Sequence, residues 1–498
     1  MATTAAPELV SVNPATLEPV GSVRRTDPAE VSLVVAAAQA VQERWWAVGA
    51  DARARFLAEV ARVVRAHADE IADSIVAETA KPRTEALANE LYAAVDHASW
   101  LAKHAPRVLA DERVRFSQLH LKTKKAWLLY EPLGVVAAIT PWNIPFAIPF
   151  REVATAVAAG NAAVLKPSEL TPLTGEWVRR VFQKAGFPDG LVQVVQGEGP
   201  VGEALVDDPG ISKVFFTGSV PVGRRVAAAA GARGCPVVLE LGGKDPMIVF
   251  ADANLERAVD GALFASFLNA GQACVSAERI YVERSVYDEF AERLSRRTQE
   301  LKLGEDVGPL ISERQRDNVE RLTNARRPER GGWFLEPTVM RGPLPDEEIF
   351  GPVVTVEPFD GEDEAVRHAN DSEFGLAASV WSRDLAKANR VARRIEAGMV
   401  WVNDFGYSFT TGQASWGGVK SSGFGRTSSK HGLYECVQVK YVDSDRGLLR
   451  PVWWFPYDAK TERALRVALD VLYGSGFQRW RDAWRHRGEL RHLLRRSR

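Results

Sequence analysis

The sequence contains few cysteines and no long apolar run. Its three cysteines, Cys235, Cys274 and Cys436, are too few and too scattered for a disulfide framework. They fit a reducing compartment, in which a lone thiol is either buried and inert or chemically reactive. No stretch reaches about 18 consecutive apolar residues, so no membrane-spanning helix is predicted. The first residues lack a basic segment followed by an apolar run, so no secretory signal is predicted and we expect a cytoplasmic protein.

An excess of charge of one sign is also lacking. The 498 residues include 63 Lys or Arg and 64 Asp or Glu, a net charge of −1, so overall charge gives no reason to expect a nucleic-acid partner. Apolar residues make up 46% and charged residues 26%, which is typical of a soluble globular protein. The chain is too long for one ordinary hydrophobic core, and we expect two or three domains.

The order of the predicted elements favours an α/β fold. Apolar residues recur at helical spacing between Asp51 and Val76, and we expect the first hundred or so residues to be mainly helical. From Glu131 onward, short apolar runs typical of strands alternate with helical patterns. A second α/β stretch extends from about Pro236 to about Trp416. This alternation predicts a parallel sheet with helices on its faces.

One segment interrupts this pattern. From Arg115 to Pro132, polar and apolar residues are interleaved as in an exposed β-hairpin. The segment lies between the helical start and the first predicted parallel strand, where a protruding oligomerisation arm can be inserted. We therefore predict a hairpin in this place.

The tail from Pro451 differs in composition from the rest. It holds eleven Lys or Arg against five Asp or Glu, a net charge of 11 − 5 = +6, and four of the fourteen tryptophans. Apolar residues recur at helical spacing from Thr461 to Tyr473, which predicts an amphipathic helix. A second helix is predicted from about Phe477. Three alternatives stay open: packing on its own or a neighbouring subunit, peripheral contact with an anionic membrane, or a solvated tail.

Cys274 stands in the segment GQACVSAERI. Its neighbours Gly271 and Ala273 are small, which leaves room for a carbonyl carbon to approach a thiolate. A thiol needs a nearby positive charge, a dipole or a base to become a thiolate. Taken alone, a cysteine in an apolar run is more often a buried small hydrophobe.

Two further polar residues stand at the ends of predicted strands. In LELGGKDP, Glu240 follows an apolar run, and apolar surroundings raise the pKa of a carboxyl and make it a usable general base. In TPWNIPF, the amide of Asn143 can donate to a developing oxyanion. The ordinary alternatives are a salt-bridged glutamate and a turn-capping asparagine.

An anion site is predicted in FFTGSVPVG, where a strand is followed by Gly218 and Ser219 and then by a helix that begins near Gly223. The free N–H groups and the dipole at a helix N-terminus favour a phosphate. The segment differs from the common G-x-G-x-x-G pattern, and by itself it is a weak signal.

Together these segments resemble the aldehyde dehydrogenase superfamily over nearly the whole chain, to about Val442. TPWN, LKPSE, FTGS, LELGGK, GQ-x-C and EEIFGPV occur in the order of that family, and WVND and WGGVKSSGFGR complete the series. The separation of 34 residues between Glu240 and Cys274 is also that of the family. The chain is similar to the non-acylating members, which use NAD or NADP.

The resemblance implies an α/β fold with a Rossmann-like NAD-binding domain, an α/β catalytic domain, a protruding β-hairpin oligomerisation arm and a basic, Trp-rich C-terminal extension. The NAD-binding domain is expected at residues 1–113 and 133–239, and the catalytic domain at 240–434. The arm is expected at 114–132 and 435–448, and the C-terminal extension at 449–498. A homodimer or homotetramer is the expected assembly, a small aldehyde is the expected substrate, and no metal site is expected.

The resemblance also implies a mechanism. Cys274 is expected to attack the aldehyde carbon, and the Asn143 side chain and the Cys274 backbone N–H are expected to hold the oxyanion of the thiohemiacetal. Hydride transfer to the nicotinamide of NAD leaves a thioester, and Glu240 activates the water that hydrolyses it to the carboxylic acid. Covalent catalysis thus divides one difficult oxidation into two easier steps.

A set of cofactor-binding residues follows from the same resemblance. Lys166 and Glu169 of LKPSE are expected on the adenosine ribose, where the Glu169 carboxylate accepts from both ribose hydroxyls and repels a 2′-phosphate, which favours NAD over NADP. The other residues are expected near the adenosine and pyrophosphate (Trp142, Gly218, Ser219, Gly223) and on the nicotinamide ribose and ring (Glu348, Phe350).

The sequence departs from the family in three places. The stretch between LKLGED and EEIFGPV is shorter than usual, which removes surface segments. Thr427 stands where some members have a glutamate that assists the base, so Glu240 is expected to act alone. Ser415 replaces the proline that usually precedes the aromatic-Gly-Gly run, and this change is expected to alter the loop that lines the substrate tunnel.

The substrate class stays open between two alternatives. Arg151 occupies a position where members that act on carboxylate-bearing semialdehydes, such as succinate semialdehyde, often carry arginine. Leu268, however, stands where those enzymes place a second arginine. The same region is made apolar by Ile144, Phe146, Ile148 and Phe150. An aliphatic or aromatic aldehyde is therefore favoured.

Two other functions compete with this one. Acylating relatives, which pass the acyl group to coenzyme A, lack the base glutamate, and the presence of Glu240 argues against that class. A non-catalytic structural relative has no reason to retain the cysteine, the glutamate and the asparagine together, and all three are present.

Overall fold

The computed structural model describes residues 8–118, 121, 123–323, 325–343, 345–447 and 450–497. The chain forms two units, one made of Met1–Ala110 and Glu131–Gln438 and the other of Asp111–Tyr130 and Val439–Arg498. The expected boundary between the arm and the extension, at residues 448 and 449, lies outside the described residues, as do residues 1–7 of the expected NAD-binding domain.

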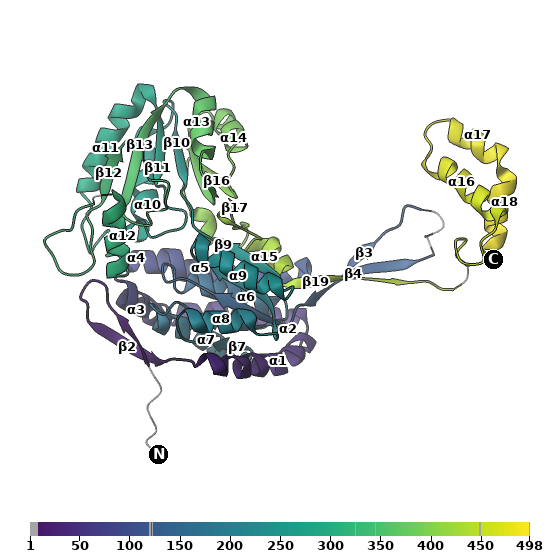
Figure 1. The fold of residues 1–498 in the computed structure, drawn as a ribbon, viewed down its shortest axis with the longest axis horizontal. Coiled ribbons are helices and arrows are strands. Elements are labelled where there is room, and N and C mark those ends of the chain that lie inside the picture. The colour runs from purple at the N-terminus through teal and green to yellow at the C-terminus, as the bar shows by residue number, and fades with distance from the viewer. Residues whose placement is uncertain are drawn as a thin grey trace, which may run out of the picture. The chain divides into compact units, whose positions relative to one another are not determined.

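The first unit contains a six-stranded sheet, of which β7 and β9 are labelled in Figure 1. Its strands, in spatial order, are β18 (Gly423–Phe424), β9 (Val237–Glu240), β8 (Ile211–Thr217), β5 (Val135–Ile139), β6 (Ala162–Lys166) and β7 (Val192–Val194). Neighbouring strands are parallel except β18, which pairs antiparallel with β9. Every residue of β5 and β6 is buried, as expected for parallel strands covered on both faces.

The order of these strands reverses beside β5. From β5 the chain continues to β6 and β7 on one side, and then crosses to β8 and β9 on the other side. In parallel sheets, ligands bind beyond the carboxyl ends of the strands at such a reversal. TPWN follows β5 and FTGS spans the end of β8, so the topology brings two motifs that are distant in the sequence to one edge of the sheet.

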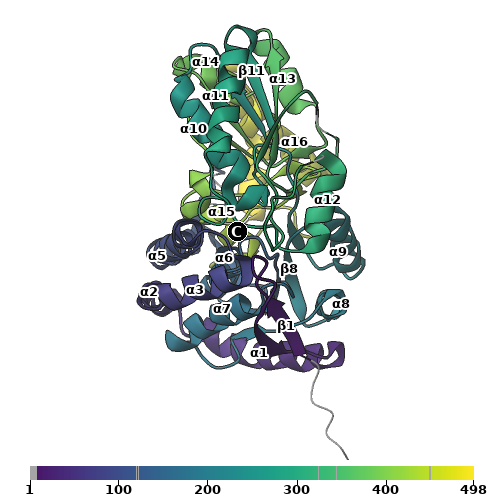
Figure 2. The same cartoon turned by 90° about the vertical axis from the view of Figure 1, so that its left-hand side faces the viewer.

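Helices flank this sheet on both sides. They are α1 (Val31–Ala47), α2 (Ala50–Ala66), α3 (Ala68–Thr79), α4 (Arg83–Glu85), α5 (Tyr92–Val108), α6 (Ala147–Ala158), α7 (Pro172–Lys184), α8 (Gly199–Asp207), α9 (Val220–Ala232) and α15 (Ser429–Glu435). In Figure 2, α2, α3 and α5 lie on one side of β8, and α8 and α9 lie on the other. All twelve residues of α6 are buried, including the charged pair Arg151 and Glu152.

The prediction that the first hundred or so residues are mainly helical is confirmed, and the structure adds two details. An antiparallel hairpin, β1 (Glu8–Val12) and β2 (Pro19–Arg24), precedes the helices. Only two residues of β1 are buried, so its alternation is too short to stand out in the sequence. The helical pattern between Asp51 and Val76 is divided into α2 and α3 at His67, whose φ of −111° and ψ of 22° interrupt the helix.

A second six-stranded sheet in the first unit has only parallel pairs among its described strands. In spatial order these are β12 (Thr338–Arg341), β13 (Val353–Phe359), β11 (Arg279–Glu283), β10 (Pro246–Val249), β15 (Ala377–Trp381) and β16 (Met399–Val402). The accompanying helices are α10 (Leu255–Phe267), α11 (Tyr287–Gln299), α12 (Glu313–Thr323), α13 (Gly361–Asn370) and α14 (Leu385–Ala392). A short antiparallel pair, β14 (Phe374–Gly375) and β17 (Val419–Lys420), completes this part. The predicted α/β fold with a second α/β region is therefore confirmed.

The second unit contains a three-stranded sheet, with β19 (Val437–Ser444), β4 (Lys125–Pro132) and β3 (Glu112–Val114) in that spatial order. β3 and β4 form the predicted antiparallel hairpin. Its first strand ends at Val114, however, so the strand precedes the predicted start at Arg115. Three residues of backbone pairing are too few to show as a pattern in the sequence.

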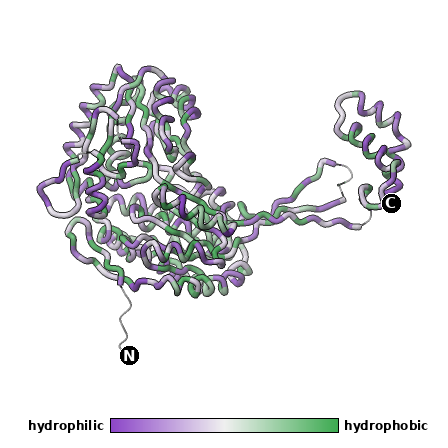
Figure 3. Tube along the Cα trace, viewed as in Figure 1, coloured by the Kyte–Doolittle hydropathy of each residue, from purple (hydrophilic) through white to green (hydrophobic). Residues whose placement is uncertain are grey.

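The tail of the second unit is helical. The predicted helix is α16 (Ala459–Tyr473), which begins after Asp458, whose carboxylate accepts from the N–H of Thr461 at 2.7 Å. The predicted second helix is in fact two, α17 (Gln478–Arg485) and α18 (Arg487–Arg496), separated at His486. Polar and apolar residues alternate along these helices in Figure 3. Among the described residues, no helix combines the length and apolar character needed to cross a membrane.

Candidate active site

The loop after β5 is held by a buried ion pair. The ammonium of Lys81 donates to the carbonyl of Asn143 at 2.7 Å and to the carboxylate of Glu90 at 2.8 Å. Glu90 also accepts from the N–H of Phe146 at 2.7 Å. The side chains of Lys81 and Glu90 are 2% and 0% exposed, so solvent does not compete for these bonds. The pair fixes the backbone of Asn143, whose side-chain amide donates to the carbonyl of Gln272 at 3.0 Å.

The loop that carries Cys274 is strained and firmly held. Asn269 and Ala270 have φ angles of 52° and 57°, a region that costs free energy for any residue except glycine. The N–H of Asn269 donates to the carboxylate of Glu85 at 3.0 Å, and its side chain donates to the carbonyl of Asn143 at 3.0 Å. Gln272 accepts from the N–H of Ile311 at 2.9 Å. These contacts from three parts of the chain compensate for the strain and fix the position of the thiol.

Glu240 ends β9 beside Thr217, its register partner at the end of β8. The side chain is buried, and neither carboxyl oxygen has a hydrogen-bond partner among the described residues. Burial raises the pKa of Glu240 to about 8, an effect that Arg151 and Arg426 oppose. The prediction that apolar surroundings raise this pKa is confirmed, and the group can accept a proton near neutral pH.

The two glycines of LELGGK allow a close approach of other groups. A Cβ on Gly242 would collide with the carboxylate of Glu348, and a Cβ on Gly243 would collide with the carbonyl of Cys274. The N–H of Gly243 donates to Glu348 at 3.1 Å. The turn after Glu240 therefore brings the Glu348 carboxyl and the Cys274 loop together.

The EEIFGPV segment is anchored by a buried carboxylate. Glu278 accepts from the N–H groups of Ile349 and Phe350, both at 2.9 Å. Phe350 has a φ of 52°, and its ring lies edge-on to that of Trp142 with a centroid separation of 5.6 Å. The structure thus places Trp142 beside Phe350.

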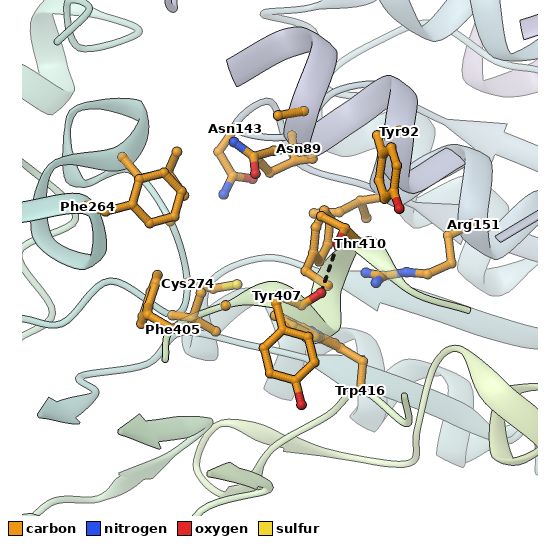
Figure 4. A pocket seen from close by; sticks show the side chains of 18 of the residues that line it. Asn89, Tyr92, Asn143, Arg151, Phe264, Cys274, Phe405, Tyr407, Thr410 and Trp416 are labelled. Atoms are coloured by element: carbon orange, nitrogen blue, oxygen red, sulfur yellow. Dashed lines mark hydrogen bonds between the residues drawn. The ribbon is translucent and has the colours of Figure 1, made fainter. Parts of the chain in front are cut away.

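Two cavities meet at Cys274. The first, of about 620 Å³, is lined largely by apolar and aromatic side chains, and Figure 4 shows the guanidinium of Arg151 pointing into it. The second, of about 340 Å³, is lined by Trp142, Gly218, Ser219, Glu348 and Phe350 among others. The residues shared by both cavities are Asn143, Ile148, Thr217, Glu240, Leu241 and Cys274. The three predicted catalytic residues therefore lie together at the junction.

The thiol of Cys274 is surrounded by more negative than positive groups. Burial raises its pKa well above the ordinary value, nearby carboxyls add to this effect, and Arg151 opposes it. The carboxyls are those of Asp245, Glu240 and Glu348. A thiol in this setting needs a base to become a nucleophile, and Glu240 lines the same two cavities.

The remaining predicted cofactor residues lie outside the second cavity. Lys166 ends β6, and its ammonium lies 3.6 Å from the carboxylate of Glu169, whose side chain is 41% exposed. Gly223 lies in the first turn of α9, where a Cβ would collide with Leu241. Lys166 and Glu169 are therefore together at the carboxyl end of a strand, and Gly223 lies in close contact with Leu241.

The two positions at which this chain departs from the family, Ser415 and Thr427, adjoin Trp416, which lines the first cavity. Thr427 exchanges two backbone hydrogen bonds with Trp416, at 2.8 and 2.9 Å, and so fixes a residue that lines this cavity. The hydroxyls of Thr427 and Ser415 are buried without a hydrogen-bond partner among the described residues.

Several residues of the site were not predicted from the sequence. Lys81, Glu90, Gln272 and Glu278 act by fixing loops. Nothing in the local sequence distinguishes Lys81 and Glu90 from surface residues, whereas Gln272 and Glu278 stand in the segment GQACVSAERI and were assigned no role there. Glu152 did have a signal, because a charged residue followed Arg151 within an otherwise apolar helical segment between two buried strands.

Comparisons with known proteins agree with this geometry. The model of the aldehyde dehydrogenase family matches residues 2–442. A betaine aldehyde dehydrogenase of Cereibacter sphaeroides is 37% identical over 454 residues, which is 86% of this chain and 92% of the relative. One of Rhizobium etli is 37% identical over 458 residues, 87% of this chain and 93% of the relative.

Solved structures show the same likeness. The betaine aldehyde dehydrogenase of Staphylococcus aureus, in complex with NAD+, superposes with a TM-score of 0.84 at 33% identity and covers 90% of this chain and 94% of its own. An aldehyde dehydrogenase of Brucella melitensis gives a TM-score of 0.83 at 36% identity, with coverage of 88% and 94%. We conclude from the fold, from the junction of two cavities at Cys274 and from these matches that the chain belongs to the aldehyde dehydrogenase family.

Proposed function

We propose that this chain oxidises an aldehyde to the carboxylic acid with NAD through a covalent intermediate on Cys274. The observation that carries the proposal is the junction of the two cavities, where Cys274, Asn143 and Glu240 line both. A substrate carbonyl in the first cavity and a nicotinamide in the second would then meet at the thiol.

The second cavity suits a dinucleotide. Gly218 and Ser219 line it just before α9, and a helix N-terminus offers free N–H groups to a pyrophosphate. The carboxyl of Glu348, which lines this cavity, would accept hydrogen bonds from a ribose, and Phe350 and Trp142 would offer ring surfaces. NAD bound in this cavity would supply the hydride acceptor that converts the thiohemiacetal into a thioester.

In the first step, the Cys274 sulfur attacks the aldehyde carbon. The thiol proton passes to the Glu240 carboxylate, a C–S bond forms, and the carbonyl electron pair moves to oxygen. The oxyanion is held by the Asn143 amide and by the Cys274 N–H. One N–H of the Asn143 amide donates to the carbonyl of Gln272, and the second N–H would be the donor to the oxyanion.

Before the last step, Glu240 releases the thiol proton to solvent and becomes a carboxylate again. It then removes a proton from water, and the hydroxide attacks the thioester carbon. The C–S bond breaks, the sulfur leaves as thiolate, and the acid is released. The presence of Glu240 at the junction favours water over coenzyme A as the acyl acceptor. Product analysis with and without coenzyme A distinguishes the two.

We propose a neutral aliphatic or aromatic aldehyde as the substrate. Tyr92, Phe264, Phe405, Tyr407, Phe409 and Trp416 line the first cavity. Among the described lining residues, Arg151 is the one cation, and its guanidinium carbon lies 4.6 Å from the centre of the Phe409 ring and 5.6 Å from that of Trp416. Arg151 therefore covers the Phe409 and Trp416 rings and adds a positive charge to the cavity, which disfavours a cationic substrate such as the betaine aldehyde named for the relatives.

A succinate-semialdehyde-type activity is the second candidate, because Arg151 points into the cavity. Leu268 lines the same cavity and supplies no second positive charge. The buried carboxyls of Glu240 and Glu152 already face Arg151. A substrate carboxylate would meet this negative charge, so the neutral aldehyde is preferred.

A panel of aldehydes tests the proposal, with NADH formation followed by absorbance. Benzaldehyde and a medium-chain aliphatic aldehyde should give kcat/KM values above those of succinate semialdehyde and betaine aldehyde. Failure of every aldehyde to reduce NAD would contradict the proposed function, and a clear preference for betaine aldehyde would contradict the role of Arg151.

Replacing Glu169 with Ser should raise activity with NADP relative to NAD. The change removes a half-exposed carboxylate that would repel a 2′-phosphate and leaves the ammonium of Lys166 free to attract one. The ratio of the two kcat/KM values should shift toward NADP by about tenfold or more. A tenfold shift corresponds to a change of about 1.4 kcal/mol in the preference for one cofactor over the other. A ratio that does not move, or a native enzyme that already prefers NADP, would count against this assignment.

We propose that the chain assembles as a homodimer or homotetramer through the three-stranded sheet of the second unit. All residues of β19 after Val437 are exposed, and β3 and β19 are the edge strands of this sheet. Unpaired edges are sites for pairing with another chain. We also propose that residues 1–113 with 133–239 form the NAD-binding domain and that residues 240–434 form the catalytic domain.

We propose that the tail binds a second copy of this chain. Only Thr461 and Ala464 of α16 are buried, and Leu469, Leu472 and Tyr473 of the same helix are exposed. The exposed aromatic residues are Trp453, Trp454, Phe455, Tyr457, Tyr473, Phe477, Trp480 and Trp484. The tail carries a net charge of +6, which leaves −1 − 6 = −7 on the rest of the chain. A basic, aromatic surface complements an acidic partner.

Truncation after Gly447 should reduce the assembly size or the melting temperature, as measured by light scattering and calorimetry. Changing Trp480 and Trp484 to Ser should do the same, because these side chains are 64% and 72% exposed and are not needed for the fold of the tail. If the assembly is unchanged and binding to vesicles of phosphatidylcholine with phosphatidylglycerol is lost instead, the tail contacts membranes. No change in assembly size, melting temperature or vesicle binding would indicate a solvated tail.

A further inference from the structure

A second buried carboxyl lies beside Glu240. Glu152 belongs to α6, every residue of which is buried, and the residue is 2% exposed. An ionised carboxylate in such a place is costly unless it is paired and hydrogen-bonded. No step described above uses Glu152, so its burial next to the base requires an explanation.

The sheet register brings Glu152 and Glu240 together. The hydroxyl of Thr217 donates to one oxygen of Glu152 at 3.0 Å, and Thr217 is the register partner of Glu240. Register partners on adjacent parallel strands direct their side chains to the same face of the sheet. The second oxygen of Glu152 and both oxygens of Glu240 are buried without hydrogen-bond partners among the described residues.

We propose that Glu152 and Glu240 form a carboxyl pair that holds one proton, and that Glu152 is a positioning residue that controls when Glu240 is free to act as a base. The inference rests on the proposed function, because it assigns Glu240 the deacylation step. Two neighbouring carboxyls in a buried site do not ionise together easily, since the second negative charge is repelled by the first.

The charges around the pair support one retained proton. Burial raises the pKa of Glu152 to about 8; the Thr217 hydroxyl and Arg151 oppose this, and Glu240 adds to it. With one proton on the pair, the single remaining negative charge is matched by Arg151. Burial lowers the pKa of the neighbouring His97 to about 3, so this histidine is neutral. The other titratable groups that face the pair are Arg426, Cys274 and Cys436.

The pH profile of deacylation tests the pair. The steady-state rate after the NADH burst is measured from about pH 6 to about pH 10 for the native enzyme, Glu152→Gln and Glu152→Asp. Removal of the second carboxyl lets Glu240 ionise without repulsion, so the midpoint of the Glu152→Gln profile should move to lower pH by about half to one unit. Glu152→Asp keeps a carboxyl and should stay nearer the native midpoint.

Glu78→Gln is the matched control. Glu78 is also a buried carboxyl, but it accepts from the N–H groups of Leu173 and Thr174 at the start of α7. Its loss should leave the midpoint unchanged, and melting curves show whether each variant is folded. An unchanged midpoint in folded Glu152→Gln, or an equal shift in Glu78→Gln, would overturn the pair. A normal rate of deacylation in Glu240→Gln would contradict the proposed function itself. This outcome is distinct from the outcomes that overturn the carboxyl pair.

Discussion

Glu240→Gln should give a stoichiometric burst of NADH followed by turnover about 10²–10⁴-fold slower than in the native enzyme, the usual contribution of a general base. The amide keeps the size of the side chain and cannot accept a proton from water. Thioester hydrolysis therefore slows far more than the formation of the thiohemiacetal. Stopped-flow absorbance of NADH separates the two phases.

The burst itself is informative. Glu240 is also expected to receive the thiol proton, because the Cys274 pKa is raised by burial. The burst in Glu240→Gln should therefore be slower than in the native enzyme but reach the same amplitude. Unchanged steady-state turnover would remove Glu240 from the mechanism.

Cys274→Ala should abolish both the burst and the turnover, with a loss of at least about 10⁴-fold, because the residue that forms the covalent intermediate is gone. NAD binding should persist, since Cys274 is one of many residues that line the second cavity. Cofactor binding can be followed by the quenching of tryptophan fluorescence.

Cys235→Ala is the matched control for this variant. Cys235 is buried and lies outside both cavities, and burial raises its pKa. It should retain the full activity of the native enzyme. Appreciable dehydrogenase activity in Cys274→Ala, or an equal loss in Cys235→Ala, would contradict the assignment of the nucleophile.

The core of the fold was predictable because its signals are local. β5 and β6 are short apolar runs buried on both faces, and the helices between the strands show helical spacing. The hairpin of β1 and β2 and the three-residue β3 were not predicted at their true places, because β1 has only two buried residues and β3 only three residues, too few to form a pattern in the sequence. His67 and His486 divide predicted helices, and neither position carries the glycine or proline that usually marks a break.

The candidate site was predictable for a different reason. Cys274, Glu240 and Asn143 stand in motifs whose order resembles a family, and the structure brings the three to one junction. The residues that hold them could not be found in this way. The Lys81–Glu90 pair stabilises the Asn143 backbone through contacts between distant segments, and such contacts leave no pattern in the local sequence.

The most direct test of the central claim is the detection of the acyl group on Cys274. Glu240→Gln is mixed with NAD and an aldehyde from the panel and quenched with acid during the slow phase. The mass of the intact protein is then measured by mass spectrometry. The account predicts one acyl group per chain, located on the peptide that contains Cys274 and absent in Cys274→Ala. An unmodified protein after a full NADH burst, or an acyl group on another residue, would contradict it.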